Sequence, residues 1–140
     1  MPDQTYQGGC LCGAVRFAAQ GAVARFTHCH CGRCRKATGT GHATNLILKP
    51  GRVAWLQGED KVRRYRLPEA ERFATSFCAE CGSPLPRVAA ELEMVVIPAG
   101  SLDTDPGLRP QGHIFWDSRA EWSCPAAGLP TYPEYPPTAG

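Results

Sequence analysis

The stretch FCAECGSPL, Phe77–Leu85, decides the fold because it places two cysteines at the spacing of a metal-binding turn. Cys78 and Cys81 are three positions apart, and Gly82 follows directly, which lets the backbone curl around both sulfurs. Such a turn supplies two thiolate ligands, whereas a structural zinc ion normally takes four. The stretch therefore predicts that two further ligands come from elsewhere in the chain.

A second pair of cysteines lies near the N-terminus, in GGCLCGAVRF, Gly8–Phe17. Cys10 and Cys12 are two positions apart, and in an extended segment residues at this spacing point to the same side. We therefore predict one structural zinc site with four thiolate ligands, which are Cys10, Cys12, Cys78 and Cys81. Two disulfides are the alternative. The opening MPDQTYQGG has neither the basic nor the apolar region of a signal peptide, so we expect a cytoplasmic protein with zinc rather than disulfides.

The stretch THCHCGRCRK, Thr27–Lys36, contains three more cysteines: Cys29, Cys31 and Cys34. This spacing can place three thiolates around one metal, with the last on the first turn of a short helix. Three protein ligands and an open position are typical of a catalytic zinc, and the open position can hold water or a substrate thiol. Alternatively, His28 or His30 closes the site as a second structural zinc. Strict alternation along a strand turns both histidines away from Cys29 and Cys31, which favours the open site.

The rest of the sequence predicts a mostly β protein of one domain. With 140 residues and 43% hydrophobic residues, it is long enough for one ordinary core and too short for two. Short runs of β-branched and aromatic residues alternate with glycine and proline, which predicts many short strands. We place them at Ala14–Phe17, Val23–His28, Ala43–Leu48, Val53–Gln57, Val62–Arg66, Arg72–Ser76 and Met94–Ile97, with tight turns at Leu48–Arg52 and Leu56–Asp60. The one expected helix covers about Gly32–Ala37, and Gly39 can end it.

The C-terminal part differs in composition from the rest. Residues 125–140 contain five prolines and little to bury, so we expect an extended, partly disordered tail after a single zinc-binding domain at residues 1–124. Cys124 has no partner at ligand spacing and is expected to be an ordinary thiol. No apolar run approaches the roughly 20 residues of a membrane helix. The formal net charge of +2 predicts no strong field toward nucleic acid or membrane.

Four segments together resemble the glutathione-dependent formaldehyde-activating enzyme family, whose relatives include centromere protein V. They are GGCLCGAVRF, CHCGRCRKATG, FCAECGSPL and AGSLDTDPGLRPQGHIFWDSRAEW. The resemblance runs from Gly8 to about Trp122 and implies a β-tent fold of small antiparallel sheets organised around zinc. It also implies a structural zinc at the four-cysteine set and a second, nominally active-site zinc at Cys29, Cys31 and Cys34. The family's founding activity joins glutathione to formaldehyde, giving S-hydroxymethylglutathione, and is classed as a carbon–sulfur lyase.

The residues around the second site suggest how such a substrate would bind. Arg33, Arg35 and Lys36 are candidates for holding the carboxylates of glutathione, or alternatively form a solvated helix face that offsets thiolate charge. His113 matches the family's His-Ile-aromatic segment and is a candidate general acid, general base or substrate-orienting residue, with a purely structural role as the alternative. His42 is expected to lie at the surface or in a hydrogen bond.

These observations predict a zinc-dependent enzyme, monomeric or homodimeric, that acts on a thiol–aldehyde adduct. A zinc with three thiolate ligands carries a formal net negative charge, which makes delivery of a thiol a better role for it than activation of a carbonyl. The alternative is a non-catalytic zinc module that binds glutathione, another small molecule or a partner protein. A nucleic-acid role for KVRRYR, Lys61–Arg66, is disfavoured by the low net charge, and we interpret this segment as an exposed strand whose charges discourage edge pairing.

Overall fold

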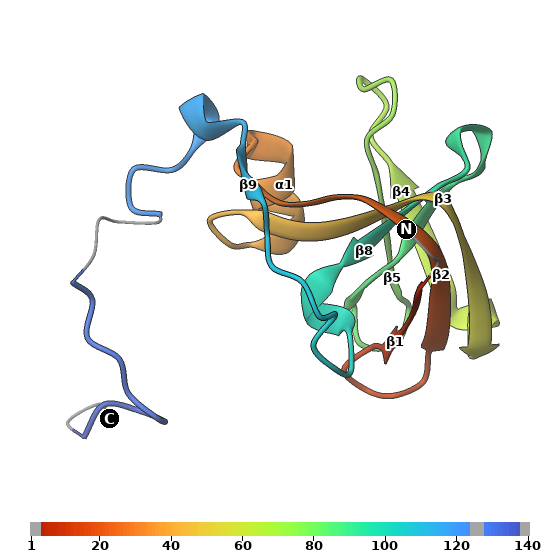
Figure 1. Ribbon diagram of the computed structural model, residues 1–140, viewed down its shortest axis with the longest axis horizontal. Coiled ribbons are helices and arrows are strands. Elements are labelled where there is room, and N and C mark those ends of the chain that lie inside the picture. The colour runs from red at the N-terminus through yellow and green to blue at the C-terminus, as the bar shows by residue number, and fades with distance from the viewer. Residues whose placement is uncertain (1–3, 124–127, 138–140) are drawn as a thin grey trace.

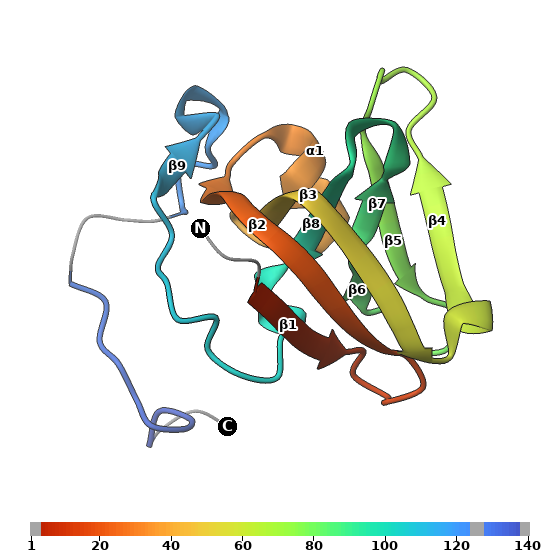
Figure 2. The same cartoon turned by 45° about the vertical axis from the view of Figure 1, so that its right-hand side comes forward.

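The computed structural model describes residues 4–123 and 128–137. It contains two β-sheets that pack against each other (Figures 1 and 2). The larger, six-stranded sheet has the order β1-β2-β3-β8-β7, with β9 also paired to β2, and the smaller, three-stranded sheet has the order β4-β5-β6. The strands are β1 Gln4–Gly9, β2 Arg16–Cys29, β3 Ala43–Gln57, β4 Val62–Arg66, β5 Ala74–Cys78, β6 Pro84–Leu85, β7 Arg87–Ala89, β8 Met94–Pro98 and β9 Gly112–Ile114. Helix α1 covers Gly32–Thr38, and short 3₁₀ turns cover Glu59–Lys61, Ala90–Leu92, Ala99–Ser101 and Trp116–Ser118.

The strands β2 and β3 are each longer than the sequence predicts. The turn expected at Leu48–Arg52 is wrong, because β3 runs through it without reversing. The pairing of the two strands shifts register between Gly21 and Val23 and again between Val23 and Arg25. Gly21 faces Gly51 there, and a Cβ atom at Gly21 would lie 2.2 Å from the carbonyl oxygen of Pro50. The paired glycines thus let two strands bend together where the sequence suggests a break.

The core fills the space between the two sheets. Phe17, Leu46, Leu48 and Ile97 are fully buried on the larger sheet, and Leu85 meets them from the smaller one. Alternate residues of β5 and β8 are buried, as expected for strands with one face on a core. The mostly β fold with small antiparallel sheets and one helix is therefore confirmed.

The helix α1 begins and ends close to the predicted positions. Cys31 is its N-cap, and its sulfur accepts a hydrogen bond from the backbone N–H of Cys34 at 3.3 Å. Gly39 ends it in the left-handed conformation, with φ of 72°. The short strands β1, β6, β7 and β9 were not predicted, because their segments lack the hydrophobic alternation that marks longer strands.

The segment after Ser123 is described only in part. Residues 128–137 form neither helix nor strand, run apart from the sheets and are nearly all exposed (Figure 1). Cys124 lies outside the described residues, as do residues 125–127 and 138–140. The proposed division into a domain at 1–124 and a tail at 125–140 stays a prediction. None of the helices in the described ranges has the length and apolarity to cross a membrane.

Candidate metal centres

The first cluster joins the two sheets through four sulfurs. Cys10 and Cys12 lie in the turn between β1 and β2, whereas Cys78 ends β5 and Cys81 lies in the turn before β6. Their four Sγ atoms all lie within 4.8 Å of one another. The Cys10–Cys12 Sγ distance is 3.6 Å and the Cys12–Cys78 distance is 3.9 Å. These values are far from a disulfide of about 2.05 Å, and they match the edge of about 3.8 Å in a tetrahedron with Zn–S bonds of about 2.3 Å.

Backbone groups around this cluster are arranged to support thiolates. The N–H of Val15 donates to Cys10 Sγ at 3.2 Å, and the N–H of Glu80 donates to Cys78 Sγ at 3.4 Å. Each second cysteine is followed by a left-handed glycine, with φ of 81° at Gly13 and 76° at Gly82. The conformation proposed for Gly82 is therefore present, and both turns present amide donors to sulfur.

Ser83 links the two turns and was not singled out by the sequence. Its Oγ accepts from the N–H of Leu11 at 3.0 Å and lies 3.2 Å from Cys81 Sγ, to which its O–H can donate. This hydrogen bond is the main cause that lowers the pKa of Cys81 to about 6. The position two residues after the second cysteine of the turn is the signal that sequence reasoning could have used.

The second cluster forms where β2 passes into α1. Cys29 is the last residue of β2, Cys31 caps the helix, and Cys34 lies on its first turn. Their three Sγ atoms lie within 4.8 Å of one another, and among the described residues no histidine nitrogen or carboxylate joins the group. Figure 1 shows α1 and β9 at the same end of the larger sheet. The donor set is thus three thiols, which fits a zinc ion with one position left for another ligand.

The three thiols of the second cluster differ in acidity. Burial raises the pKa of Cys29 and, more strongly, that of Cys34, where hydrogen bonding to the other two sulfurs adds to the effect. At Cys31 burial acts in the same direction, but hydrogen bonds from the Cys34 backbone and from neighbouring groups lower the pKa overall. Cys31 is therefore the thiol that most readily loses its proton, and binding of a metal must displace protons from the others.

All four histidines of the chain gather on one side of β2, a convergence that the sequence did not reveal. His28 pairs with His113 in the register of β2 and β9. His28 and His42 share Thr44 Oγ1, at 2.7 Å and 3.2 Å, and their ring centroids are 4.3 Å apart. Successive strand residues point to opposite faces, so Cys29 and this cluster lie on different faces of β2. The alternative in which His28 or His30 closes the second metal site is therefore not favoured.

His113 makes its main contact with the buried His30. His113 Nδ1 lies 2.8 Å from His30 Nε2, and the ring of Trp116 packs against both imidazoles with centroids 5.0 Å and 4.9 Å away. His30 is fully buried, and burial lowers its pKa. His113 itself is exposed, so it connects a buried neutral imidazole to solvent.

The basic residues proposed for substrate lie on α1 next to the second cluster. Arg33 and Lys36 are exposed, and Arg35 is partly buried. The Nε atom of Arg35 is buried and has no hydrogen-bond partner among the described residues. Arg35 and Lys36 lie in the last turn, where they also stabilise the negative end of the helix.

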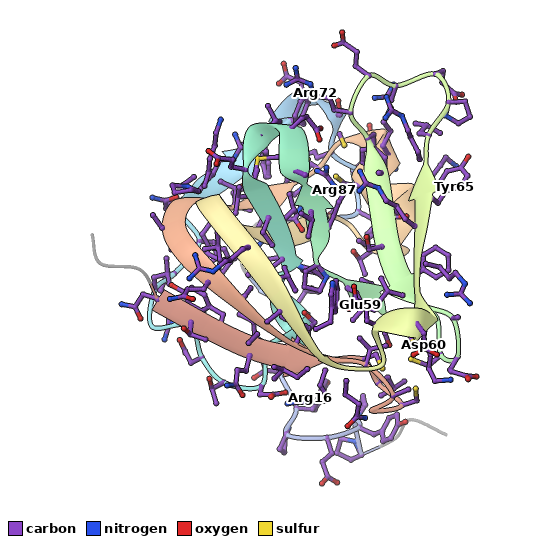
Figure 3. The ribbon with its side chains drawn as sticks, turned by 90° about the vertical axis from the view of Figure 1, so that its right-hand side faces the viewer. Arg16, Glu59, Asp60, Tyr65, Arg72 and Arg87 are labelled. Atoms are coloured by element: carbon purple, nitrogen blue, oxygen red, sulfur yellow. The ribbon has the colours of Figure 1, made fainter. Side chains whose placement is uncertain are left out.

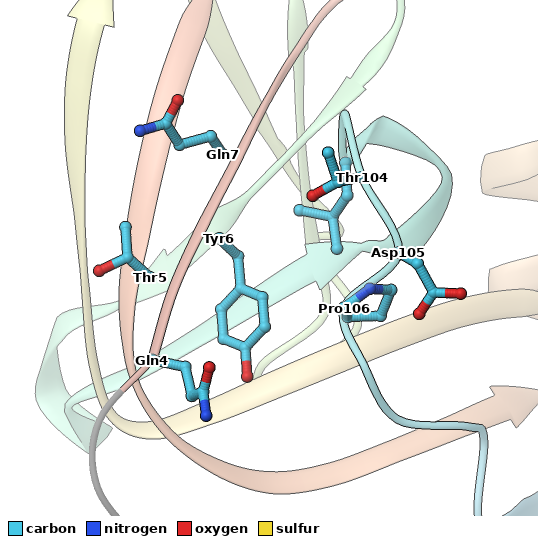
Figure 4. Close-up of a pocket in the computed structure, with 8 residues that line it drawn as sticks. Gln4, Thr5, Tyr6, Gln7, Thr104, Asp105 and Pro106 are labelled. Atoms are coloured by element: carbon cyan, nitrogen blue, oxygen red, sulfur yellow. The ribbon is translucent and has the colours of Figure 1, made fainter.

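A polar pocket lies at the far end of β1, away from the cysteines and histidines (Figure 4). It is lined by Gln4, Thr5, Tyr6, Gln7, Leu102, Thr104, Asp105 and Pro106. Its one carboxylate, that of Asp105, already accepts hydrogen bonds from Arg109 Nη1 and from the N–H of Gly107. The only charged side chain in the pocket lining is therefore already paired.

Comparison with known proteins gives a family match over a range that includes both cysteine clusters. The family model described as "Glutathione-dependent formaldehyde-activating enzyme" matches residues 5–118, a range that contains both cysteine clusters. Among solved structures, a structural-genomics crystal structure of a Rhodobacter sphaeroides protein is 22% identical to this chain. The similarity covers 74% of this chain and 97% of that one, with a TM-score of 0.48.

Proposed function

The chain belongs to the glutathione-dependent formaldehyde-activating enzyme family, and on this premise we propose that it is a zinc-dependent carbon–sulfur lyase acting on a thiol–aldehyde adduct. The reference reaction is the addition of glutathione to formaldehyde to give S-hydroxymethylglutathione, and its reversal. The proposal assigns a structural role to the four-cysteine cluster and the reaction to the three-cysteine cluster.

The difference between the two clusters is the observation that carries this proposal. The first cluster has four sulfurs within 4.8 Å of one another, and four thiols are the donor set of a closed structural site. The second has three, from Cys29, Cys31 and Cys34, with no further histidine or carboxylate ligand among the described residues. A metal held by three ligands keeps a position for a substrate atom.

The reaction itself needs a deprotonated thiol beside an aldehyde. The sulfur forms a bond to the carbonyl carbon as the C=O π bond breaks, and the proton lost by the thiol finishes on the new hydroxyl oxygen. When bound, zinc supplies the positive charge that favours thiolate over thiol. The cysteines of the site would hold the zinc ion at the N-terminus of α1. The protein also increases the rate by bringing both reactants to one place.

The remaining roles fall to residues around the site. We propose Arg33, Arg35 and Lys36 for binding a carboxylate of glutathione, since two are exposed and Arg35 has an unpaired buried N–H group. We propose His113 as the carrier of the transferred proton, supported by its solvent exposure and its hydrogen bond to His30. Since the histidine cluster lies on the other face of β2 from Cys29, His113 would exchange this proton through solvent and not by direct contact with the three thiols.

Exchange spectroscopy by NMR tests the proposal, because it measures formation and breakdown of the adduct at equilibrium even though the uncatalysed addition is fast. Zinc-loaded protein is expected to increase the exchange rate between free and adducted glutathione, and Cys34→Ser is expected to abolish the increase. His113→Gln should lower the rate while glutathione binding is retained. A wild-type protein that binds glutathione without accelerating exchange would instead establish the non-catalytic zinc module.

A further inference from the structure

The three thiols of the second cluster are held by two different elements of the fold. Cys29 ends β2 and pairs with Ala43 of β3, so the larger sheet fixes its position. Cys31 and Cys34 belong to the start of α1, where the backbone N–H of Cys34 donates to Cys31 Sγ at 3.3 Å. One residue, His30, joins the two elements. The position of the Cys29 sulfur relative to the other two therefore depends on how His30 is held.

Packing of the helix itself contributes little to this positioning. No residue of α1, Gly32–Thr38, is fully buried. A helix of 7 residues is also too short to be stable without tertiary contacts. Its orientation must therefore come from the residues at its ends, and the junction with β2 is fully buried at His30.

His30 is attached to the segment that follows β9 through both its backbone and its side chain (Figures 1 and 2). Its N–H donates to the carbonyl oxygen of Ile114 at 3.0 Å, which extends the parallel pairing of β2 and β9 by one residue. Its Nε2 and the Nδ1 of His113 share a hydrogen bond of 2.8 Å. The rings of Trp116, His113 and His42 surround the imidazole, with centroids 5.0, 4.9 and 5.0 Å away.

A histidine at this buried position is unexpected from packing alone. Its Nδ1 is buried and has no hydrogen-bond partner among the described residues, which is unfavourable for a polar atom. An apolar side chain of similar size would avoid this cost and could still pack against Trp116. It could not form the directed hydrogen bond to His113. The property that distinguishes histidine here is thus a fixed connection between the junction and the segment after β9.

The partner segment bends in a way that completes this contact. Phe115 lies between β9 and the 3₁₀ turn Trp116–Ser118, and its left-handed backbone has a φ of 54°. This conformation is strained for a residue other than glycine and persists only where surrounding contacts compensate for it. The bend leaves the ring of Phe115 62% exposed and places that of Trp116 against both His30 and His113.

We propose that His30 is a positioning residue for the second metal centre. Its hydrogen bond to His113 holds the junction of β2 and α1 so that the three thiols of the second cluster converge on one metal ion. Alternation along the chain points the His30 side chain away from the thiols, so it acts through the backbone of the junction. The inference rests on the proposed function only for the assignment of a metal to these cysteines.

Co²⁺ binding at the second cluster tests this role without measuring the reaction. The full chain is prepared with zinc in the first cluster only, Co²⁺ is added, and its thiolate charge-transfer and d–d absorption bands are recorded. The bands that Cys34→Ser lacks belong to the second site. His30→Phe keeps an aromatic ring but removes the hydrogen bond, and it should weaken Co²⁺ binding about tenfold or more and shift the d–d bands.

Two further variants connect this effect to the hydrogen bond itself. His30→Gln keeps an amide nitrogen that can donate to His113 Nδ1, so it should restore Co²⁺ binding to within about threefold of wild type. His113→Phe removes the same bond from the other side and should weaken binding as His30→Phe does. The double variant should lose no more than the larger of the two single losses, because both remove one interaction.

His28→Phe is the matched control. His28 is next to Cys29 on the other side, but its Nδ1 is paired with Thr44 Oγ1 at 2.7 Å, within the pairing of β2 and β3. Tyr65→Ala is a remote control, because Tyr65 is 53% exposed on β4, on the side of the molecule turned away from β9 (Figure 3). Both variants should bind Co²⁺ within about twofold of wild type.

Unchanged affinity and bands in His30→Phe, an equal loss in His28→Phe, or additive losses in the double variant would overturn the proposal. If His30→Phe fails to fold, as judged by zinc in the first cluster and by melting, the exposed His113→Phe carries the same comparison.

The two proposals can fail independently. Weakened Co²⁺ binding in His30→Phe, together with wild-type protein that does not accelerate adduct exchange, would refute the proposed reaction and leave the positioning role standing. Accelerated exchange by wild-type protein, together with wild-type Co²⁺ binding in His30→Phe, would refute the positioning role alone.

Discussion

The two cysteine clusters should contribute differently to the free energy of unfolding. Each has a cysteine that is exposed or only partly buried, so a variant can remove one sulfur without damaging the core. Cys12 is exposed and Cys34 partly buried, so replacement of either by serine removes a ligand with little loss of packing. If free zinc is held at a thousand times its dissociation constant, a site present only in the folded state stabilises that state by about 4 kcal/mol. For a chain of this length this corresponds to roughly 12–16 °C in melting temperature.

Zinc at the first cluster should give nearly the whole of this stabilisation, because the cluster exists only in the folded chain. It joins sulfurs 66 positions apart, such as those of Cys12 and Cys78, and an unfolded chain must close this long loop to bind the metal. The second cluster lies within residues 29–34, so an unfolded chain can still bind zinc there, and binding to the unfolded state reduces the stabilisation.

Thermal melting in zinc buffers measures the difference. We expect Cys12→Ser to lower the melting temperature by about 12–16 °C at saturating zinc, whereas Cys34→Ser should lower it by much less. Elemental analysis should give about two zinc ions per wild-type chain and about one in Cys34→Ser. Equal losses of melting temperature in the two variants would refute this division of roles. Cys78→Ser should unfold the chain or destabilise it further, because its side chain is also buried in the core.

Three further predictions concern pH and packing. Zinc affinity at the second cluster should increase with pH between about 6 and 8, since the raised pKa of Cys34 keeps that thiol protonated until zinc displaces the proton. Competition with a chromophoric chelator measures the affinity at each pH. An affinity that does not change with pH would contradict the prediction. Gly8→Ala should destabilise by about 1–3 kcal/mol in urea unfolding, because its Cβ would lie 2.1 Å from the Ser101 carbonyl oxygen, whereas Gly100→Ala, with open space, should change stability by less than about 1 kcal/mol. Leu46→Ala should cost about 2–5 kcal/mol by the same measurement, since its side chain is fully buried between the sheets; a loss below about 1 kcal/mol would contradict that packing.

The two cysteine clusters that could hold metal were largely predictable because their information is local. Cys78 and Cys81 with Gly82 specify one turn by spacing and by a left-handed glycine, and the structure gives Gly82 a φ of 76°. The end of the helix followed in the same way from Gly39, whereas Cys31 as its N-cap is a finding of the structure.

Strand boundaries were less predictable where tertiary contacts override local signals. The proline and glycines at Leu48–Arg52 favour a turn locally, yet β3 continues through them. The reason is long-range: Gly51 pairs with Gly21 of β2, and the N–H of Gly51 donates to the carbonyl oxygen of Glu93 at 2.8 Å. A single segment contains no signal of partners that lie 30 or more positions away in the chain.

By itself, the sequence determined which cysteines belong together, because ligand spacing and turn chemistry act over a few residues. It could not determine that His28, His30, His42 and His113 form one cluster. These residues lie in or next to the strands β2, β3 and β9, whose pairing depends on burial of the core between two sheets. Only the folded chain brings such residues together, since the free energy that holds them there comes from the packing of the whole and not from the residues themselves.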